Sequence, residues 1–149
     1  MLKAIGFAVV IACATFTGAF AAPAEDAALA PIHQFADGMN AGDMKKAAGA
    51  YAPSVSIIDE FAPHHWSSFA AWLHDAGAWF KAGGVTDLHI EYGAVGDTVI
   101  GASQAYAVVP TTLTYNVKGK PTTEKGLFTF ALTKAKSGWR IASWAWSTL

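Results

Sequence analysis

Hydrophobic residues recur every three or four positions in the first half of the chain, which is the period of an α-helix buried on one side. Residues 24–41 carry this pattern, and Gly42 and Asp43 then provide a C-cap and the N-cap of a short helix over 44–50. Residues 55–61 alternate as a strand does, and a third helix is predicted to begin after Ser67 or Ser68. The apolar positions of the first helix are Leu29, Ile32, Phe35, Ala36 and Met39, and those of the third are Phe69, Trp72, Leu73, Ala76 and Phe80.

The second half of the chain has the alternation and the β-branched residues of strands. Strands are predicted over 86–94, 98–109, 111–118, 123–134 and 139–147, with turn-forming residues at 95–97, at Pro110, at 119–121 and at 136–138. The last two of these links are turn-like, so the strands they join should be antiparallel. Helices followed by a run of strands predict a single α+β domain, in which a curved antiparallel sheet wraps around three N-terminal helices.

Three tryptophans occur in the predicted last strand. Strict alternation places Trp139 on the face opposite to Trp144 and Trp146. Large apolar residues on both faces of a strand indicate that both faces are covered. One face would contact the helices, and we expect the other to contact a second copy of the chain in a homodimer.

The first 21 residues are predicted to be a secretory signal peptide. Lys3 is followed by an uncharged, mostly apolar run, and residues 19–21 form an A-x-A cleavage site. A periplasmic or secreted protein without a stable membrane span is therefore expected, with the mature domain over 22–149. A lipoprotein signal is the alternative, because residues 10–13 loosely resemble a lipobox that would make Cys13 a lipidated N-terminus.

Composition excludes several classes of protein. Hydrophobic residues make up 53% of the chain and charged residues 14%, which is incompatible with disorder. The formal net charge is −1, so no basic surface is expected for nucleic acid. The single cysteine excludes a disulfide framework and a cysteine-rich zinc site. No metal or other cofactor is predicted.

Asp59 is the polar residue most in need of an explanation. In the first predicted strand, Val55, Ile57 and Phe61 share its face, and a carboxylate on an apolar face is costly unless it is paired or functional. Desolvation would raise its pKa and suit it to act as a general base. Alternatively, Asp59 is a structural acceptor for a backbone amide or a tryptophan N–H, or it lies at the exposed end of the strand. His64 and His65 follow in a loop and are interpreted mainly as solvated side chains.

Three stretches of the chain resemble the nuclear transport factor 2-like superfamily, which includes the SnoaL-like cyclases and the ketosteroid isomerases. They are the N-A-G-D corner at residues 35–44, the helix-to-strand junction at 50–59, and the closing strand with Gly138–Ile141 and residues 144–147. The resemblance implies a cone of curved sheet closed by three helices around an apolar pocket, and dimers through the outer face of the sheet. The candidates for lining such a pocket are Phe35, Ile57, Phe61, Trp66, Phe69, Trp72, Tyr106 and Phe128.

The resemblance also places Asp59 where ketosteroid isomerases keep their catalytic base. The two groups that stabilise the enolate in those enzymes are missing, because Phe35 replaces the oxyanion tyrosine and Gly126 lies near the position of the protonated aspartate. The first hypothesis is therefore an exported domain that binds a small hydrophobic molecule. The alternatives are a cofactor-independent isomerase, lyase or cyclase with Asp59 as general base, and a protein-interaction module that uses the sheet face.

Overall fold

The structure, a computed structural model, describes residues 21–149, with side chains from Ala24 onward. Apart from Ala21, at which the first helix begins, the predicted signal peptide and Cys13 lie outside the described residues. Within residues 21–149, no helix combines the length and the hydropathy needed to cross a membrane.

Three helices lie on one side of the sheet: α1 (Ala21–Asn40), α2 (Met44–Ala48) and α3 (Phe69–Gly83). The predicted caps are confirmed. The carboxylate of Asp43 accepts from Lys46 N at 2.9 Å, and the hydroxyl of Ser68 accepts from Ala71 N at 3.2 Å. Gly84 ends α3 with a φ of 68°, in the left-handed region that glycine adopts without strain.

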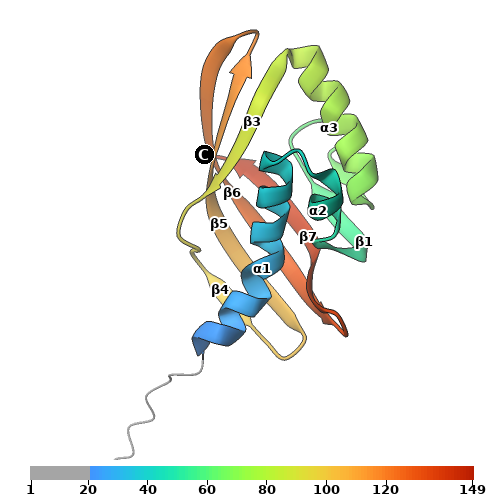
Figure 1. Cartoon of the computed structure of the whole chain (residues 1–149), viewed down its shortest axis with the longest axis vertical. Coiled ribbons are helices and arrows are strands. Elements are labelled where there is room, and N and C mark those ends of the chain that lie inside the picture. Colours follow the sequence, from blue (N-terminus) through green and yellow to red (C-terminus); the bar gives the residue numbers. More distant parts are fainter. Residues whose placement is uncertain (1–20) are drawn as a thin grey trace, which may run out of the picture.

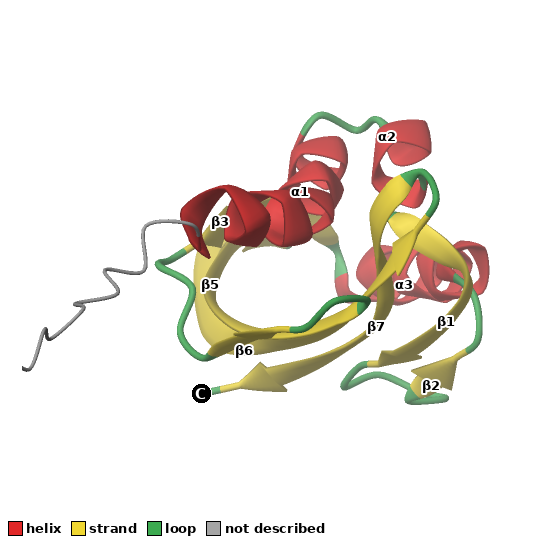
Figure 2. Ribbon diagram, turned by 90° about the horizontal axis from the view of Figure 1, so that it is seen from below, coloured by secondary structure: helices red, strands yellow, loops and turns green. Residues whose placement is uncertain are grey.

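The strands form one strongly curved sheet that wraps around the helices (Figures 1 and 2). Its order is β2-β1-β7-β6-β5-β3, with the short β4 paired to β5. Every described pairing is antiparallel except that of β1 with β7, which is parallel. The predicted α+β domain, with a curved sheet around three helices, is confirmed, and its sheet is mixed and mostly antiparallel. The strands are β1 (Tyr51–Ile58), β2 (His65–Trp66), β3 (Val85–Tyr92), β4 (Thr98–Ile100), β5 (Gln104–Val117), β6 (Lys120–Ala135) and β7 (Gly138–Thr148).

Several predicted boundaries are wrong. The strand predicted over 98–109 ends at Ile100 and a new one begins at Gln104, and the strand predicted over 55–61 runs from Tyr51 to Ile58. Pro110 does not separate two strands but lies inside β5, opposite Leu127 of β6. The neighbouring strand β3 has just ended at Tyr92, so the missing N–H of the proline costs the sheet little there. The predicted loop around His65 and Trp66 contains the short strand β2, which pairs with the end of β1.

A β-bulge in β7 changes which residues face the helices. Ser143 lies opposite Ala131 while Ile141 lies opposite the next residue of β6, Leu132, so β7 contains one extra residue at this point. The extra residue shifts the alternation, and Trp139 is buried on the same side as Trp144 and Trp146. The prediction that Trp139 lies on the opposite face is therefore wrong. Trp139 therefore gives no support for a homodimer through the opposite face of β7. The homodimer itself stays a prediction.

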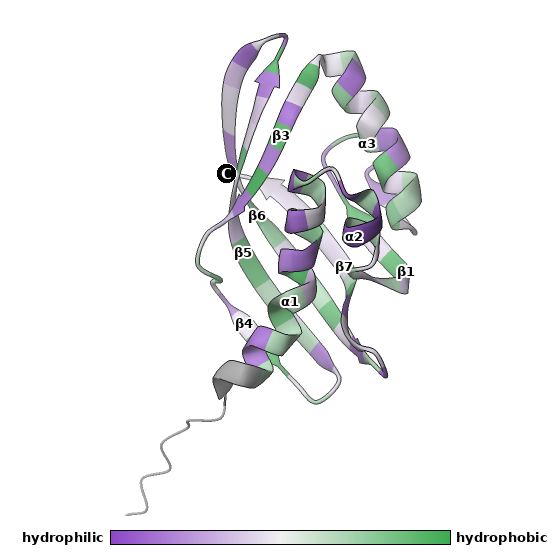
Figure 3. Cartoon of the chain, in the orientation of Figure 1, coloured by the Kyte–Doolittle hydropathy of each residue, from purple (hydrophilic) through white to green (hydrophobic). Residues whose placement is uncertain are grey.

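The core lies between the concave face of the sheet and the helices. Apolar residues alternate with polar ones along the strands (Figure 3), and α1 buries Leu29, Ile32 and Phe35 in the core. The end of α1 is fixed to β3 by Asn40, whose side-chain amide donates to Ile90 O at 2.8 Å and accepts from Ile90 N at 2.7 Å. These two bonds mimic the pairing of a neighbouring strand and hold β3 in place as one wall of the interior.

Candidate functional site

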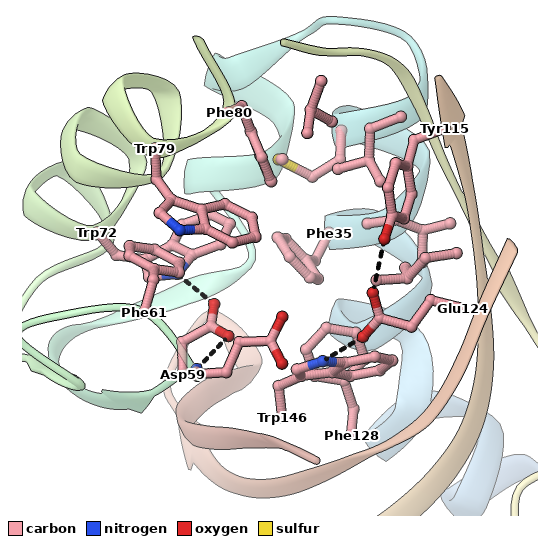
Figure 4. Close-up of a pocket in the computed structure, with 16 residues that line it drawn as sticks. Phe35, Asp59, Phe61, Trp72, Trp79, Phe80, Tyr115, Glu124, Phe128 and Trp146 are labelled. Atoms are coloured by element: carbon pink, nitrogen blue, oxygen red, sulfur yellow. Dashed lines mark hydrogen bonds between the residues drawn. The ribbon is translucent and has the colours of Figure 1, made fainter. Parts of the chain in front are cut away.

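A cavity opens in the interior between α1, α3 and the concave side of the sheet (Figure 4). Its volume is about 60 Å³, compared with roughly 150 Å³ for a protein cavity that encloses benzene. A ring-sized molecule would therefore fit only in part, or after side chains move. The cavity is lined by Phe35, Met39, Asp59, Glu60, Phe61, Trp72, Trp79, Phe80, Val85, Leu88, Ile90, Leu113, Tyr115, Glu124, Phe128 and Trp146.

Nine residues were proposed from the sequence as parts of a site, and five of them line this cavity. They are Asp59 and the aromatic residues Phe35, Phe61, Trp72 and Phe128. They come from α1, the segment after β1, α3 and β6, so the fold brings together positions that are distant in the sequence.

The other four candidates lie elsewhere. Ile57 and Phe69 are buried in the core, and Phe69 stacks on Tyr51 with ring centroids 4.6 Å apart. Trp66 is buried against Phe61 and donates its indole N–H to Asp75 at 2.8 Å. Tyr106 is 42% exposed, because its neighbours Ala105 and Ala107 take the inward positions of β5 and alternation turns Tyr106 to the outer face.

The carboxylate of Asp59 follows directly after β1 and accepts two hydrogen bonds. The indole N–H of Trp72 donates to one oxygen at 2.8 Å, and the backbone N–H of Glu60 donates to the other at 2.8 Å. Both partners proposed for a structural role, a tryptophan N–H and a backbone amide, are therefore present. Asp59 nevertheless lines the cavity, so the structural and the functional interpretations apply to the same side chain.

The surroundings of Asp59 raise the pKa of its carboxyl group. Burial raises the pKa of this carboxyl above its ordinary value of 3.8, and the hydrogen bonds from Trp72 and Glu60 offset only part of the rise. The negative charges of Glu60 and Glu124 raise the pKa further. A carboxyl group with a raised pKa is suited to exchange protons closer to neutral pH.

Two further carboxylates line the cavity, Glu60 and Glu124, and neither was proposed from the sequence for a site. Glu124 lies on β6. Its side chain accepts from Tyr115 Oη at 2.9 Å, from Trp146 Nε1 at 3.3 Å and from Thr148 Oγ1 at 2.7 Å. Burial and the bond to Glu124 raise the pKa of the Tyr115 phenol to about 12, so this phenol stays a donor. The sequence contains a signal for Glu124, because alternation places it on the same strand face as Gly126 and Phe128. The same pattern identified Asp59, which shares its face with Ile57 and Phe61.

The space near Gly126 is filled by tryptophan. A Cβ at Gly126 would lie 2.4 Å from the ring of Trp146 and 2.6 Å from Ser147 O, so a side chain there would require both β7 and this ring to move. Phe35, at the other position that resembles an isomerase donor, packs edge-on against Tyr51 and Trp72. Neither position supplies a hydrogen-bond donor for an oxyanion.

The histidines of the loop do not reach the carboxylate of Asp59 by any hydrogen bond. Both are exposed; His65 Nε2 lies 3.0 Å from Ser56 Oγ, and His64 Nδ1 lies 3.3 Å from the main-chain oxygen of Asp59. Across the part of the chain that the structure describes, no group of three or more His, Cys, Asp or Glu residues is arranged to hold a metal ion.

Solved structures with the same fold have diverse descriptions. A nuclear transport factor 2-like superfamily protein from Salmonella enterica matches with a TM-score of 0.72 and 14% identity, over 85% of this chain and 92% of its own. A ketosteroid isomerase-like protein from Erwinia carotovora matches at 0.64 and 19%, over 83% and 94%. The CaMKII hub of S. rosetta matches at 0.67 and 14%, over 83% and 95%. At these identities the likeness establishes the fold alone.

The sequence itself identifies the family. A comparison with the curated proteins finds no match. Residues 29–149, which include every strand and every residue lining the cavity, match the SnoaL-like domain. The observed fold, with three helices inside a curved and mostly antiparallel sheet, is that of the nuclear transport factor 2-like superfamily. The chain therefore belongs to the SnoaL-like domain family.

Proposed function

We propose that this domain binds a small apolar molecule, with the apolar part of the ligand inside the central cavity. The observation that carries the proposal is the lining, in which aromatic and aliphatic side chains converge with a few acidic groups and Tyr115. Cavities of this kind, mostly apolar with a few fixed polar groups, are the usual form of small-molecule sites. Because the volume is about 60 Å³, the ligand has either a few heavy atoms or one apolar end that enters.

The mouth of the cavity provides room for the rest of a longer ligand. Trp79, on α3, lines the cavity and is 45% exposed, which is unusual for so large an apolar side chain. Its ring stacks on Phe61 at 5.3 Å, so an apolar surface continues from the interior to the outside.

Filling the cavity should weaken binding. Leu113, on β5, is half-buried and lines the cavity, and Leu113→Trp would place an indole in the space. We expect 3-methylbutan-1-ol to bind the natural domain saturably, and the variant to bind it at least about tenfold more weakly, a loss of roughly 1.4 kcal/mol. NMR titration of the indole N–H signals measures both affinities.

Val99→Trp is the matched control, because Val99 is 67% exposed on β4 and does not line the cavity. This variant should bind the alcohol as the natural domain does. Equal binding by the Leu113→Trp variant, or no saturable binding by the natural domain, contradicts the proposal.

A second candidate function is proton abstraction by Asp59, in an isomerase, lyase or cyclase. The raised pKa of Asp59 at the cavity supports it. Two observations weaken it: Phe35 and Gly126 supply no oxyanion donor, and the charges of Glu60 and Glu124 would oppose a developing enolate. Binding is therefore the better-supported function.

We also propose export and self-association. Export rests on the apolar run and the A-x-A site before Ala22, and a mature chain from the native host that still begins at Met1 would contradict it.

Pairing through the outer face of the sheet is supported by Ile58 and Tyr106, which are 51% and 42% exposed. The same face would serve in a protein-interaction module, and a monomer in light scattering would count against pairing.

A further inference from the structure

The cavity combines negative charge with aromatic walls. Three of its sixteen lining residues, Asp59, Glu60 and Glu124, are acidic. All sixteen belong to the described part of the chain, and none of them is lysine, arginine or histidine. The carboxylates therefore face the cavity without a cationic side chain among the residues that line it.

Two indole rings are oriented by these carboxylates. Trp72 uses its N–H on Asp59, and Trp146 uses its N–H on Glu124 (Figure 4). With their edges held in this way, both rings still contribute to the lining. A cation near an aromatic face is attracted by the ring quadrupole, and the attraction is stronger where water is excluded.

We propose that the ligand of this cavity is an organic cation, an alkylamine or alkylammonium group attached to a small apolar body. The inference rests on the proposed function and adds the charge of the ligand to it. The apolar body occupies the space between Phe35, Leu113 and Phe128, and the cationic group lies toward Asp59 and Glu124. Inside a partly enclosed site this attraction between opposite charges is stronger than in bulk water, because the effective dielectric constant is lower.

An uncharged or anionic ligand fits these observations less well. An anion would be repelled by all three carboxylates. A neutral ligand could at most donate a hydrogen bond to one of them and would lack the charge attraction. The role of the carboxylates in orienting Trp72 and Trp146 does not depend on the charge of the ligand. The charge preference is therefore the property that separates a binding role of the carboxylates from a purely structural one.

Three probes with one carbon skeleton test the proposal: 3-methylbutylamine, 3-methylbutan-1-ol and 3-methylbutanoate. The amine is a cation at pH 7, since its pKa is close to that of lysine at about 10.4. In NMR titrations at low salt, we expect the amine to bind at least about tenfold more tightly than the alcohol, and the carboxylate to bind most weakly. The preference should shrink as salt is added.

Glu124→Gln and Asp59→Asn should each reduce the preference for the amine several-fold while the alcohol still binds, which shows that the cavity persists. Glu91→Gln is the matched control, because Glu91 is exposed on β3 and its loss changes the net charge equally without touching the lining. If the alcohol binds as tightly as the amine, the charge inference fails and the proposed function stands. Tighter binding of the carboxylate also overturns the inference. If none of the three probes binds saturably, both proposals fail.

Discussion

Replacing Phe35 with alanine should lower the free energy of unfolding by about 3–5 kcal/mol, the usual cost of removing a buried phenylalanine ring. Phe35 is 1% exposed on α1 and is the centre of the aromatic core. Its ring centroid lies between 5.7 and 6.5 Å from five others: those of Tyr51, Phe69, Trp72, Phe128 and Trp144. The ring also forms part of the cavity wall, so its removal would join new empty space to the cavity.

Urea denaturation followed by circular dichroism measures this loss. Val99→Ala is the control, because Val99 is 67% exposed and its truncation should change stability by no more than about 0.5 kcal/mol. A loss below about 1 kcal/mol for Phe35→Ala would mean that the neighbouring rings collapse into the space. The assignment of Phe35 as the centre of a rigid core would then be wrong.

Local patterns were sufficient to predict most of the elements. Asp43 and Ser68 mark helix starts because their side chains accept from backbone amides three residues later, which depends only on neighbouring sequence. Alternation over residues 55–61 placed Asp59 on the face of Ile57 and Phe61 for a similar reason, although the strand β1 ends at Ile58. These signals need no knowledge of the distant parts of the chain.

Long-range features were not accessible in this way. The parallel pairing of β1 with β7 joins Ile57 to Trp144, and nothing local in either strand specifies the direction of the pairing. The bulge at Ala142 also lacks a local signal, because a one-residue shift leaves a plausible strand in either register. The tryptophans of β7 were therefore divided between two faces when the structure places all three on one.

The prediction of the candidate site includes residues that lie elsewhere and misses others, and Tyr106 and Glu124 are an example of each. Tyr106 was assigned to the interior because it is aromatic, although Ala105 and Ala107 make an equally apolar face on the other side of β5. Glu124 was missed even though its strand gives the same signal as that of Asp59. The size and polarity of the side chains do not distinguish the inner face of β5 from the outer one. On β6, by contrast, an acidic residue on the same face as Phe128 indicates a polar group in the interior.

The charge of Asp59 connects the site with stability. Because its pKa is raised in the folded state, the folded protein binds this proton more tightly than the unfolded chain does. The contribution of Asp59 to the free energy of unfolding is therefore largest at low pH and falls as the pH rises from the ordinary pKa of 3.8 through the raised pKa. In the variant Asp59→Asn the side chain cannot ionise, so it makes no pH-dependent contribution to stability. Its amide oxygen can accept from only one of the two donors, the Trp72 indole N–H and the Glu60 backbone N–H. At neutral pH the loss of the charge stabilises the variant and the loss of one hydrogen bond destabilises it. The dependence of the free energy of unfolding on pH therefore tests the raised pKa of Asp59 better than stability at a single pH.

If Asp59 abstracts protons, Asp59→Asn should slow a base-catalysed reaction by about 10²–10⁴-fold. The reaction that isolates this step is exchange of the α-protons of 3-methylbutan-2-one for deuterium in D₂O, in which the carboxylate takes a proton from carbon and the enolate is deuterated by solvent. Asn keeps the shape of the side chain and removes its basicity, while Glu91→Gln controls for the lost charge on an exposed site. NMR follows the exchange directly. Exchange at the rate of buffer alone with the natural domain, at a ketone concentration that fills the cavity, would eliminate proton abstraction and leave binding as the function of the site.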